Sequence, residues 1–171
     1  MLKIALTNLG KYNEGELVYK WLELPATEDE IEEAKEAIGI NEQYEEWFIT
    51  DYETDIEGLQ VGEYEDLEAL NELAERYENL HEYDQDIVQA IIEGEGYDLE
   101  EALDVLESGN YSFYPDVTNE EDLGFYVVDE GLFGVEIPDS LQVYIDHESI
   151  GRDWRINGAG SFTSKGYIEL H

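Results

Sequence analysis

The first 61 residues carry short runs in which apolar and polar side chains alternate, the pattern of half-buried strands. Thr27 and Glu30 form a capping box that opens a helix through Ile38, and Tyr12–Gly15 has the composition of a turn. Residues 1–61 are therefore expected to form a small ββαβ unit, with one helix over a short sheet. Strands are predicted at Lys3–Thr7, which alternates and takes an edge-like position, at Leu17–Leu24, which Pro25 ends, and at Glu45–Tyr52, which is rich in aromatic residues.

Residues 62–109 show the helical repeat of apolar positions instead. Helical spacing is followed by Leu67, Leu70, Leu73, Ala74 and Tyr77, and by a shorter apolar set at 87–92. Asp98 and Glu101 form a second capping box in front of another apolar face. This segment predicts a bundle of three or four short helices.

Residues 110–171 mix both patterns. Thr118 and Glu121 are expected to cap a helix through Glu130, and Pro138 opens a helix over Asp139–His147. Strands are expected at Asn110–Tyr114 and, as a closing hairpin, at Ser161–Ser164 and Tyr167–Leu170. The predicted fold class is α+β, an elongated chain of three small units with boundaries 1–61, 62–109 and 110–171.

The net charge of the chain is far outside the range of an ordinary domain. The chain carries 45 Asp and Glu against 8 Lys and Arg, a formal net charge of -37. Over the surface expected for its mass, this is roughly one net charge per 230 Å², about half the density of B-DNA. The 13 Tyr, 5 Phe and 3 Trp argue against a disordered acidic tail. Such a surface repels nucleic acids and anionic lipids, so its expected partners are basic protein grooves or cations.

The predicted helices carry acids three or four residues apart with few cations between them. In pairs such as Glu68 with Glu72, the Cβ atoms lie about 5–6 Å apart, a spacing similar to that of phosphate charges on nucleic acid. Such like-charge pairs destabilise an isolated helix slightly. We therefore expect an acidic surface that stands in for DNA phosphates. Its proposed members are Glu28, Asp29, Glu32, Glu36, Glu45, Glu46, Glu65, Glu68, Glu72, Glu75, Glu100, Asp104, Glu107, Glu120, Glu121, Asp129 and Glu130.

Motifs for catalysis or metal binding are weak in this sequence. Asp51–Asp55 begins like a calcium loop, but Ile56 and Gly62 stand where that loop has glycine and glutamate. A carboxylate pair for glycoside hydrolysis is left open, because 45 acids make any pair uninformative. We expect no enzyme activity, no cofactor and no dedicated metal site. The histidines lie in no zinc-ligand pattern: His81, His147 and His171.

The compartment follows from three further features of the sequence. Cysteine is absent, which suits a reducing environment. The N-terminus lacks a secretory signal pattern, and no apolar run approaches the roughly 20 residues of a membrane span. We expect a cytoplasmic protein.

Two segments resemble the signatures of a known family. The first is Leu6–Leu17, which contains NLGKYNEG and is followed by Trp21 and Leu24-Pro25. The second combines Gly134–Leu141, Tyr144–Asp146 and Gly151–Asp153. The chain thus resembles the ArdA-type antirestriction proteins over its whole length. It departs from the pattern at His147 and Trp154, where we expect Tyr and an aliphatic residue.

Most residues of these two signatures are expected to be structural. Glycines would occupy turns, and Arg152 would pair with a local carboxylate. Ile137, Leu141 and Tyr144 would belong to the core. The acids outside the signatures would then carry the activity.

The resemblance implies a specific function. Proteins similar to this one are three-domain, DNA-mimicking homodimers encoded by mobile genetic elements. They occupy the DNA groove of type I restriction–modification enzymes, at the methyltransferase core, and do not bind nucleic acid themselves. The family dimerises through its C-terminal domain, which here would use Phe113, Tyr126, Leu132 and Phe133. The charge alone is equally consistent with an alternative function, an acidic cation-binding or scaffold protein for another basic, nucleic-acid-binding partner.

Overall fold

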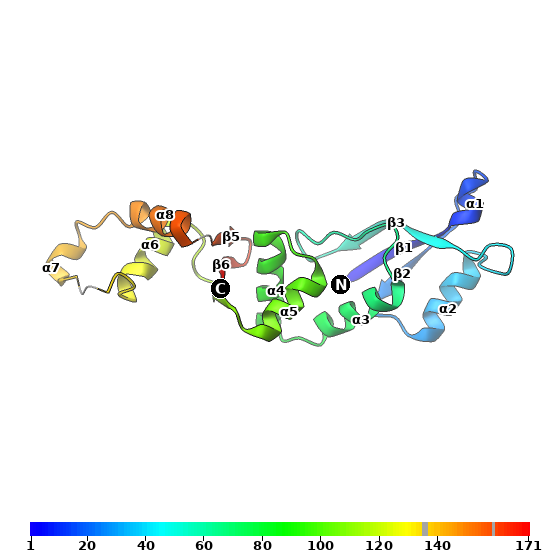
Figure 1. Ribbon diagram of the computed structural model, residues 1–171, viewed down its shortest axis with the longest axis horizontal. Helices are drawn as coiled ribbons and strands as arrows, with labels where there is room; N and C mark the ends of the chain where they lie inside the picture. Colours follow the sequence, from blue (N-terminus) through cyan, green and yellow to red (C-terminus); the bar gives the residue numbers. More distant parts are fainter. Residues whose placement is uncertain (135–136, 159) are drawn as a thin grey trace. The chain divides into compact units, whose positions relative to one another are not determined.

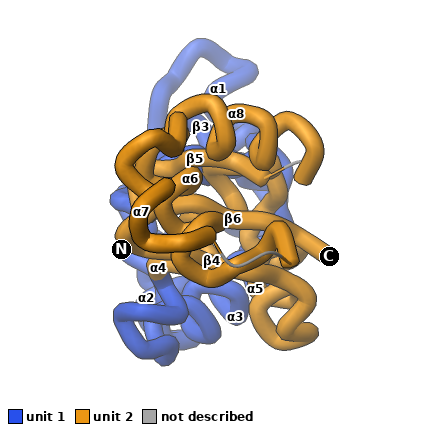
Figure 2. The backbone as a smooth tube through the Cα atoms, turned by 90° about the vertical axis from the view of Figure 1, so that its left-hand side faces the viewer, with its two compact units in different colours: residues 1–85 blue, residues 86–171 orange. Residues whose placement is uncertain are grey.

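The computed structural model describes residues 1–134, 137–158 and 160–171. Val135 and Glu136, which belong to the second signature, lie outside the described residues, as does Ala159. The fold class is α+β, with helices and two three-stranded antiparallel sheets. The chain forms two compact units, unit 1 (residues 1–85) and unit 2 (residues 86–171), shown in separate colours in Figure 2. The division into three units stays a prediction.

Unit 1 contains the three strands and the helix expected for its first 61 residues. Its sheet has the order β2-β1-β3, so β1 is the central strand and the prediction of an edge-like position is wrong. The reason is burial on both faces: Thr7 is fully buried, and its hydroxyl bonds that of Thr50 at 2.7 Å. Helices α2 and α3 lie on one side of this sheet (Figure 1). The elements are β1 (Leu2–Asn8), α1 (Leu9–Asn13), β2 (Tyr19–Leu24), α2 (Glu28–Ala37), β3 (Trp47–Thr54) and α3 (Leu67–Glu78).

The first signature folds as the end of β1 and the short helix α1, where the sequence predicted only a turn at Tyr12–Gly15. The Asn8 side chain caps α1 by accepting a hydrogen bond from the Lys11 backbone N–H at 2.9 Å. Its amide group donates to the carbonyl of Ile38 at 3.1 Å. Fully buried Asn8 therefore fastens α1 to the end of α2, which gives this signature a structural role.

Helix α2 begins as the sequence predicted. Thr27 accepts from the Glu30 backbone N–H at 3.3 Å, and the Glu30 carboxylate accepts from the Thr27 backbone N–H at 2.8 Å. Ala34 and Ile38 turn inward and are buried, while the acids of the helix are exposed. The helix is thus amphipathic, with its charged face toward solvent.

Unit 2 holds a second sheet of order β4-β6-β5, which confirms the predicted strand near 110 and the closing hairpin. The predicted capping box at Asp98 and Glu101 is also confirmed. Helix α4 spans the boundary between the units and packs on this sheet, where Gly94 faces Ile168 closely. The elements are α4 (Glu82–Glu95), α5 (Leu99–Ser108), β4 (Tyr111–Tyr114), α6 (Glu120–Asp129), α7 (Asp139–Gln142), α8 (His147–Gly158), β5 (Ser161–Thr163) and β6 (Gly166–Leu170).

Three predictions for residues 118–147 are wrong. The cap of α6 is Asn119, which accepts from the Asp122 backbone N–H at 3.0 Å, so the predicted Thr118 and Glu121 box is displaced by one residue. The helix expected over 139–147 is only the short α7, and α8 follows it. Leu141 and Tyr144, expected in the core, are 53% and 83% exposed, because α7 is only four residues long and buries none of its residues.

Helices α6 and α8 cross at two glycines. A Cβ added at Gly151 would lie 1.8 Å from the carbonyl oxygen of Glu120, and one at Gly124 would lie 1.8 Å from that of His147. No side chain fits at either position, so the two backbones touch. Gly151 therefore serves a helix crossing and not the turn expected from the sequence.

Candidate functional site

The acids proposed as phosphate substitutes are exposed on the surface, with one exception. Glu120 is half-buried, and its side chain keeps 23% of its accessible surface. The others lie on α2, α3, α5 and α6 or in the loops beside them. Exposure alone does not separate them, so the partners of each carboxylate decide which of them are free to meet a target.

Five of the proposed acids meet in one groove between α2 and α3, which we call the acidic groove. It has a volume of about 660 Å³ and lies wholly within unit 1. The two helices come from segments that the sequence assigned to different units, so their convergence was not predicted. The described lining residues are Ala26, Glu28, Ile31, Glu32, Lys35, Trp47, Asp66, Leu67, Glu68, Asn71, Glu72 and Glu75.

The acidic groove has an apolar base and a charged rim. Leu67 is buried, and Ile31 and Trp47 are half-buried, whereas the six acids of the lining are exposed. A cation that enters the groove therefore meets carboxylates at the rim and apolar surface, including an indole ring, below them.

Asn71 holds the two walls of the groove together. Its side-chain oxygen accepts from the Ala26 backbone N–H at 2.7 Å, and its side-chain amide donates to the Ala26 carbonyl at 3.0 Å. This paired hydrogen bond ties α3 to the segment that leads into α2. This link was not predicted from the sequence, although Asn71 shares a helical face with Leu67 and Ala74, and a polar residue on an apolar face signals a specific partner.

The partners of the groove carboxylates are few. Lys35 is the one basic side chain among the described lining residues, and it pairs with Glu32 at 3.1 Å. Asp66 is engaged as the N-cap of α3, where it accepts from the Glu68 and Ala69 backbone N–H groups. Across the described ranges, the remaining groove carboxylates have no hydrogen-bond or ion-pair partner: Glu28, Glu68, Glu72 and Glu75.

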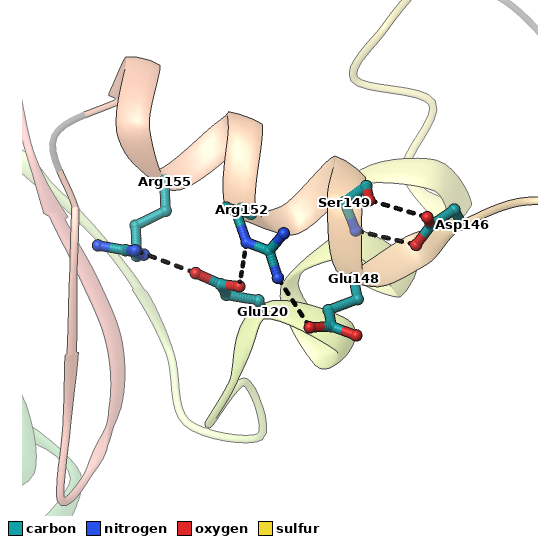
Figure 3. A network of polar contacts seen from close by, with 6 residues as sticks. All are labelled: Glu120, Asp146, Glu148, Ser149, Arg152 and Arg155. Atoms are coloured by element: carbon teal, nitrogen blue, oxygen red, sulfur yellow. Dashed lines mark hydrogen bonds and ion pairs between the residues drawn. The ribbon is translucent and has the colours of Figure 1, made fainter.

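Glu120 of unit 2 has the opposite surroundings (Figure 3). Its carboxylate accepts from Arg155 Nη2 at 3.0 Å and from Arg152 Nε at 2.9 Å, and Arg152 also bonds Glu148 at 2.8 Å. The hydrogen bond from Arg155, followed by that from Arg152, lowers the pKa of Glu120 below its ordinary value. The predicted local ion pair of Arg152 is confirmed. Glu120 is an internal counter-charge between α6 and α8, and the least exposed of the proposed acids.

The proposed acids outside the groove are spread over other segments. The Glu65 carboxylate accepts from the Gly62 backbone N–H at 3.1 Å, so it stabilises its own loop. Asp129 and Glu130 lie at the end of α6 beside a surface hollow of about 410 Å³. None of these acids lines the acidic groove. They lie on α2, α5 and α6, at the end of α6, or in the loops before β3 and α3: Asp29, Glu36, Glu45, Glu46, Glu65, Glu100, Asp104, Glu107, Glu121, Asp129 and Glu130.

The residues suggested for a dimer contact divide into two pairs. Leu132 and Phe133 are 43% and 49% exposed, close in sequence to exposed α7. Phe113 and Tyr126 are half-buried, and the Tyr126 ring lies 4.5 Å from that of Tyr114 beside the core cluster of unit 2. The first pair is thus available at the surface, and Tyr126 of the second pair is largely committed to the unit's own packing.

The calcium-like segment is not a loop, because its residues 51–54 belong to strand β3. Within the described ranges, no group of three or more His, Asp or Glu side chains is placed to hold a metal ion. In the same part of the chain, no helix is both long and apolar enough to cross a bilayer.

The family model described as "Antirestriction protein (ArdA)" matches residues 4–169, nearly the whole chain. No curated protein sequence matches the chain. The family match implies an antirestriction function, and with it an interaction with restriction–modification enzymes. The chain belongs to the ArdA family of antirestriction proteins.

Proposed function

We propose that this chain protects incoming DNA as a non-catalytic mimic of B-DNA charge, which occupies the DNA-binding groove of type I restriction–modification enzymes at the methyltransferase core. The observation that carries the proposal is the set of exposed groove carboxylates that have no cation partner among the described residues, such as Glu68 and Glu72 on α3. Carboxylates already neutralised within the chain offer little to a basic groove, whereas these keep their full charge for it.

The physical basis is competition for the same cations. A DNA-binding groove is lined with Lys and Arg that pair with phosphates, and binding releases the counterions held by each surface. A net charge of -37 steers the chain toward such a groove and away from nucleic acid itself. The inhibitor would act in the cytoplasm, where restriction enzymes meet DNA delivered by mobile genetic elements.

We further propose that the chain acts as a homodimer joined through unit 2. Support comes from the exposed apolar side chains between α6 and α8, including Phe133 at 49% exposed and Tyr144 at 83%. Exposed apolar groups in such numbers favour burial against another protein surface. Sedimentation of the chain at micromolar concentration, with Phe133→Ser beside the unaltered chain, tests this: a monomer in both cases would reject the dimer.

The inhibition itself is tested by a competition titration. A type I methyltransferase core is bound to labelled target DNA and titrated with the chain at low and at moderate salt. We expect nearly stoichiometric displacement at low salt and weaker displacement as salt rises, because screening reduces the attraction. If DNA stays bound at low salt, the proposal fails, and another basic, nucleic-acid-binding protein becomes the expected partner.

A further inference from the structure

The acidic groove differs from a plain row of phosphates, because it is a cavity with an indole ring in its lining. Its volume of about 660 Å³ falls in the range of about 300–1,000 Å³ typical of ligand pockets. Trp47 is half-buried there, and Ile31 and Leu67 complete the apolar base. A flat array of carboxylates would need none of these residues.

The chemistry of the groove favours one cation over the other. The guanidinium of arginine is planar and weakly hydrated, stacks on aromatic rings and binds two carboxylate oxygens at once. Tryptophan is the best aromatic partner for a cation. The ammonium of lysine is strongly hydrated and would lose more hydration than arginine over an apolar base.

We propose that the acidic groove receives an arginine side chain from a basic segment of the bound enzyme, with the guanidinium between carboxylates of α2 and α3 and against Trp47. The identity of the partner rests on the proposed function; the preference for arginine rests on the groove. Charge complementarity supplies the attraction, because Glu28, Glu68 and Glu72 have no cation partner in the described part of the chain. Asn71 is a positioning residue that keeps the two carboxylate-bearing walls together.

The test uses Trp47 as the reporter in the full-length chain. The sequence has three tryptophans, and replacing Trp21 and Trp154 with Phe leaves only Trp47. The probe is a blocked hexa-arginine peptide, and a blocked hexa-lysine peptide of equal charge is its control. We expect saturable quenching of Trp47 by hexa-arginine, at lower concentration than by hexa-lysine.

Two variants of equal charge separate the groove from general acidity. Glu28→Gln with Glu72→Gln removes two groove carboxylates, whereas Glu33→Gln with Glu36→Gln removes two exposed carboxylates of α2 that do not line it. The groove pair should weaken hexa-arginine binding about fivefold more than the control pair, as loss of exposed ion pairs allows. Calorimetric titration of the same variants with all three tryptophans intact measures the hexa-arginine affinities of the groove pair and the control pair independently of the Phe replacements.

The outcomes distinguish this inference from the proposed function. Equal weakening by both pairs, equal affinity for both peptides, or peptide binding without a response of Trp47 would overturn the arginine site. If the chain then still displaced DNA from the methyltransferase core, the proposed function would stand. If displacement failed while the groove bound hexa-arginine selectively, the proposed function would fall and the groove would serve another basic protein.

Discussion

Carboxylates of unit 1 and unit 2 meet opposite surroundings. In the acidic groove, Lys35 is the one cation among the described lining residues and pairs with Glu32. At the crossing of α6 and α8, Glu120 lies between two arginines of the same unit. Net charge does not distinguish the two places, but the count of internal cations does. A carboxylate is available for mimicry where the fold leaves it unpaired, and it holds the fold together where an arginine faces it.

The largest expected effect concerns the crossing itself. Gly151→Ala places a methyl group against the Glu120 carbonyl, where only backbone lies within reach, so α8 must move. We expect a loss of about 3 kcal/mol in the free energy of unfolding, at the upper end for overpacking. Urea denaturation followed by circular dichroism measures it. Gly62→Ala is the control, because its new methyl group meets only the flexible side chain of Glu65; equal losses would mean that the crossing is not tight.

A smaller effect is expected at the link that holds the groove. Asn71→Ala removes both hydrogen bonds to Ala26, so the backbone N–H and carbonyl of Ala26 stay partly buried without these partners. We expect this to cost about 2 kcal/mol in the free energy of unfolding. Asn79→Ala, in the cap position that ends α3, is the matched control, because Asn79 contributes only its backbone N–H there. Unfolding monitored by tryptophan fluorescence should separate the two variants, and identical midpoints would remove Asn71 from its positioning role.

The pH dependence of unit 2 sharpens the comparison further. Because its arginine partners lower the pKa of Glu120 in the folded state, the ion pair stabilises fully above the ordinary pKa of 4.5. This stabilisation is lost as the pH falls through the lowered pKa. The difference in unfolding midpoint between the unaltered chain and Glu120→Gln should therefore be largest near pH 7 and vanish in acid. Glu121→Gln is the control, and a difference that persists unchanged into acid would contradict the assignment.

The smallest effect is expected from single neutralisations outside the groove. Glu36→Gln removes one of many exposed acids, so inhibition of DNA binding should change by less than about twofold, in line with the small worth of one exposed charge. The concentration of chain that displaces half of the DNA measures it. Abolition of inhibition by this one change would mean that the load is not shared.

Much of the fold could be predicted because local signals and tertiary packing agree. The capping boxes at Thr27 and Asp98 and the alternating strands of both sheets appear where the sequence placed them. Helix α8 was missed because its sequence carries Gly151 and Gly158, poor helix formers. In the folded chain, α8 is in close contact with α6 at Gly124, and no local sequence pattern reveals that contact.

The candidate site was predictable only in its composition. The sequence named Glu28, Glu32, Glu68, Glu72 and Glu75 as surface acids, but nothing in their spacing showed that α2 and α3 face one another. Likewise, the pairing of an acid on α6 with arginines on α8 spans more than 30 residues. Which carboxylates are free is a property of the packed chain and not of the charge count.

The salt dependence of inhibition by two charge-matched variants tests the central claim most directly. Glu28→Gln with Glu72→Gln removes two groove acids that have no partner in the described part of the chain, and Glu120→Gln with Glu148→Gln removes the same charge from acids bound to arginine. Half-displacement of DNA from the methyltransferase core is measured for each variant across a range of salt. We predict that the groove pair weakens inhibition and flattens its salt dependence, while the paired acids leave both near those of the unaltered chain. Equal losses from the two variants would contradict the account and make total charge the determinant.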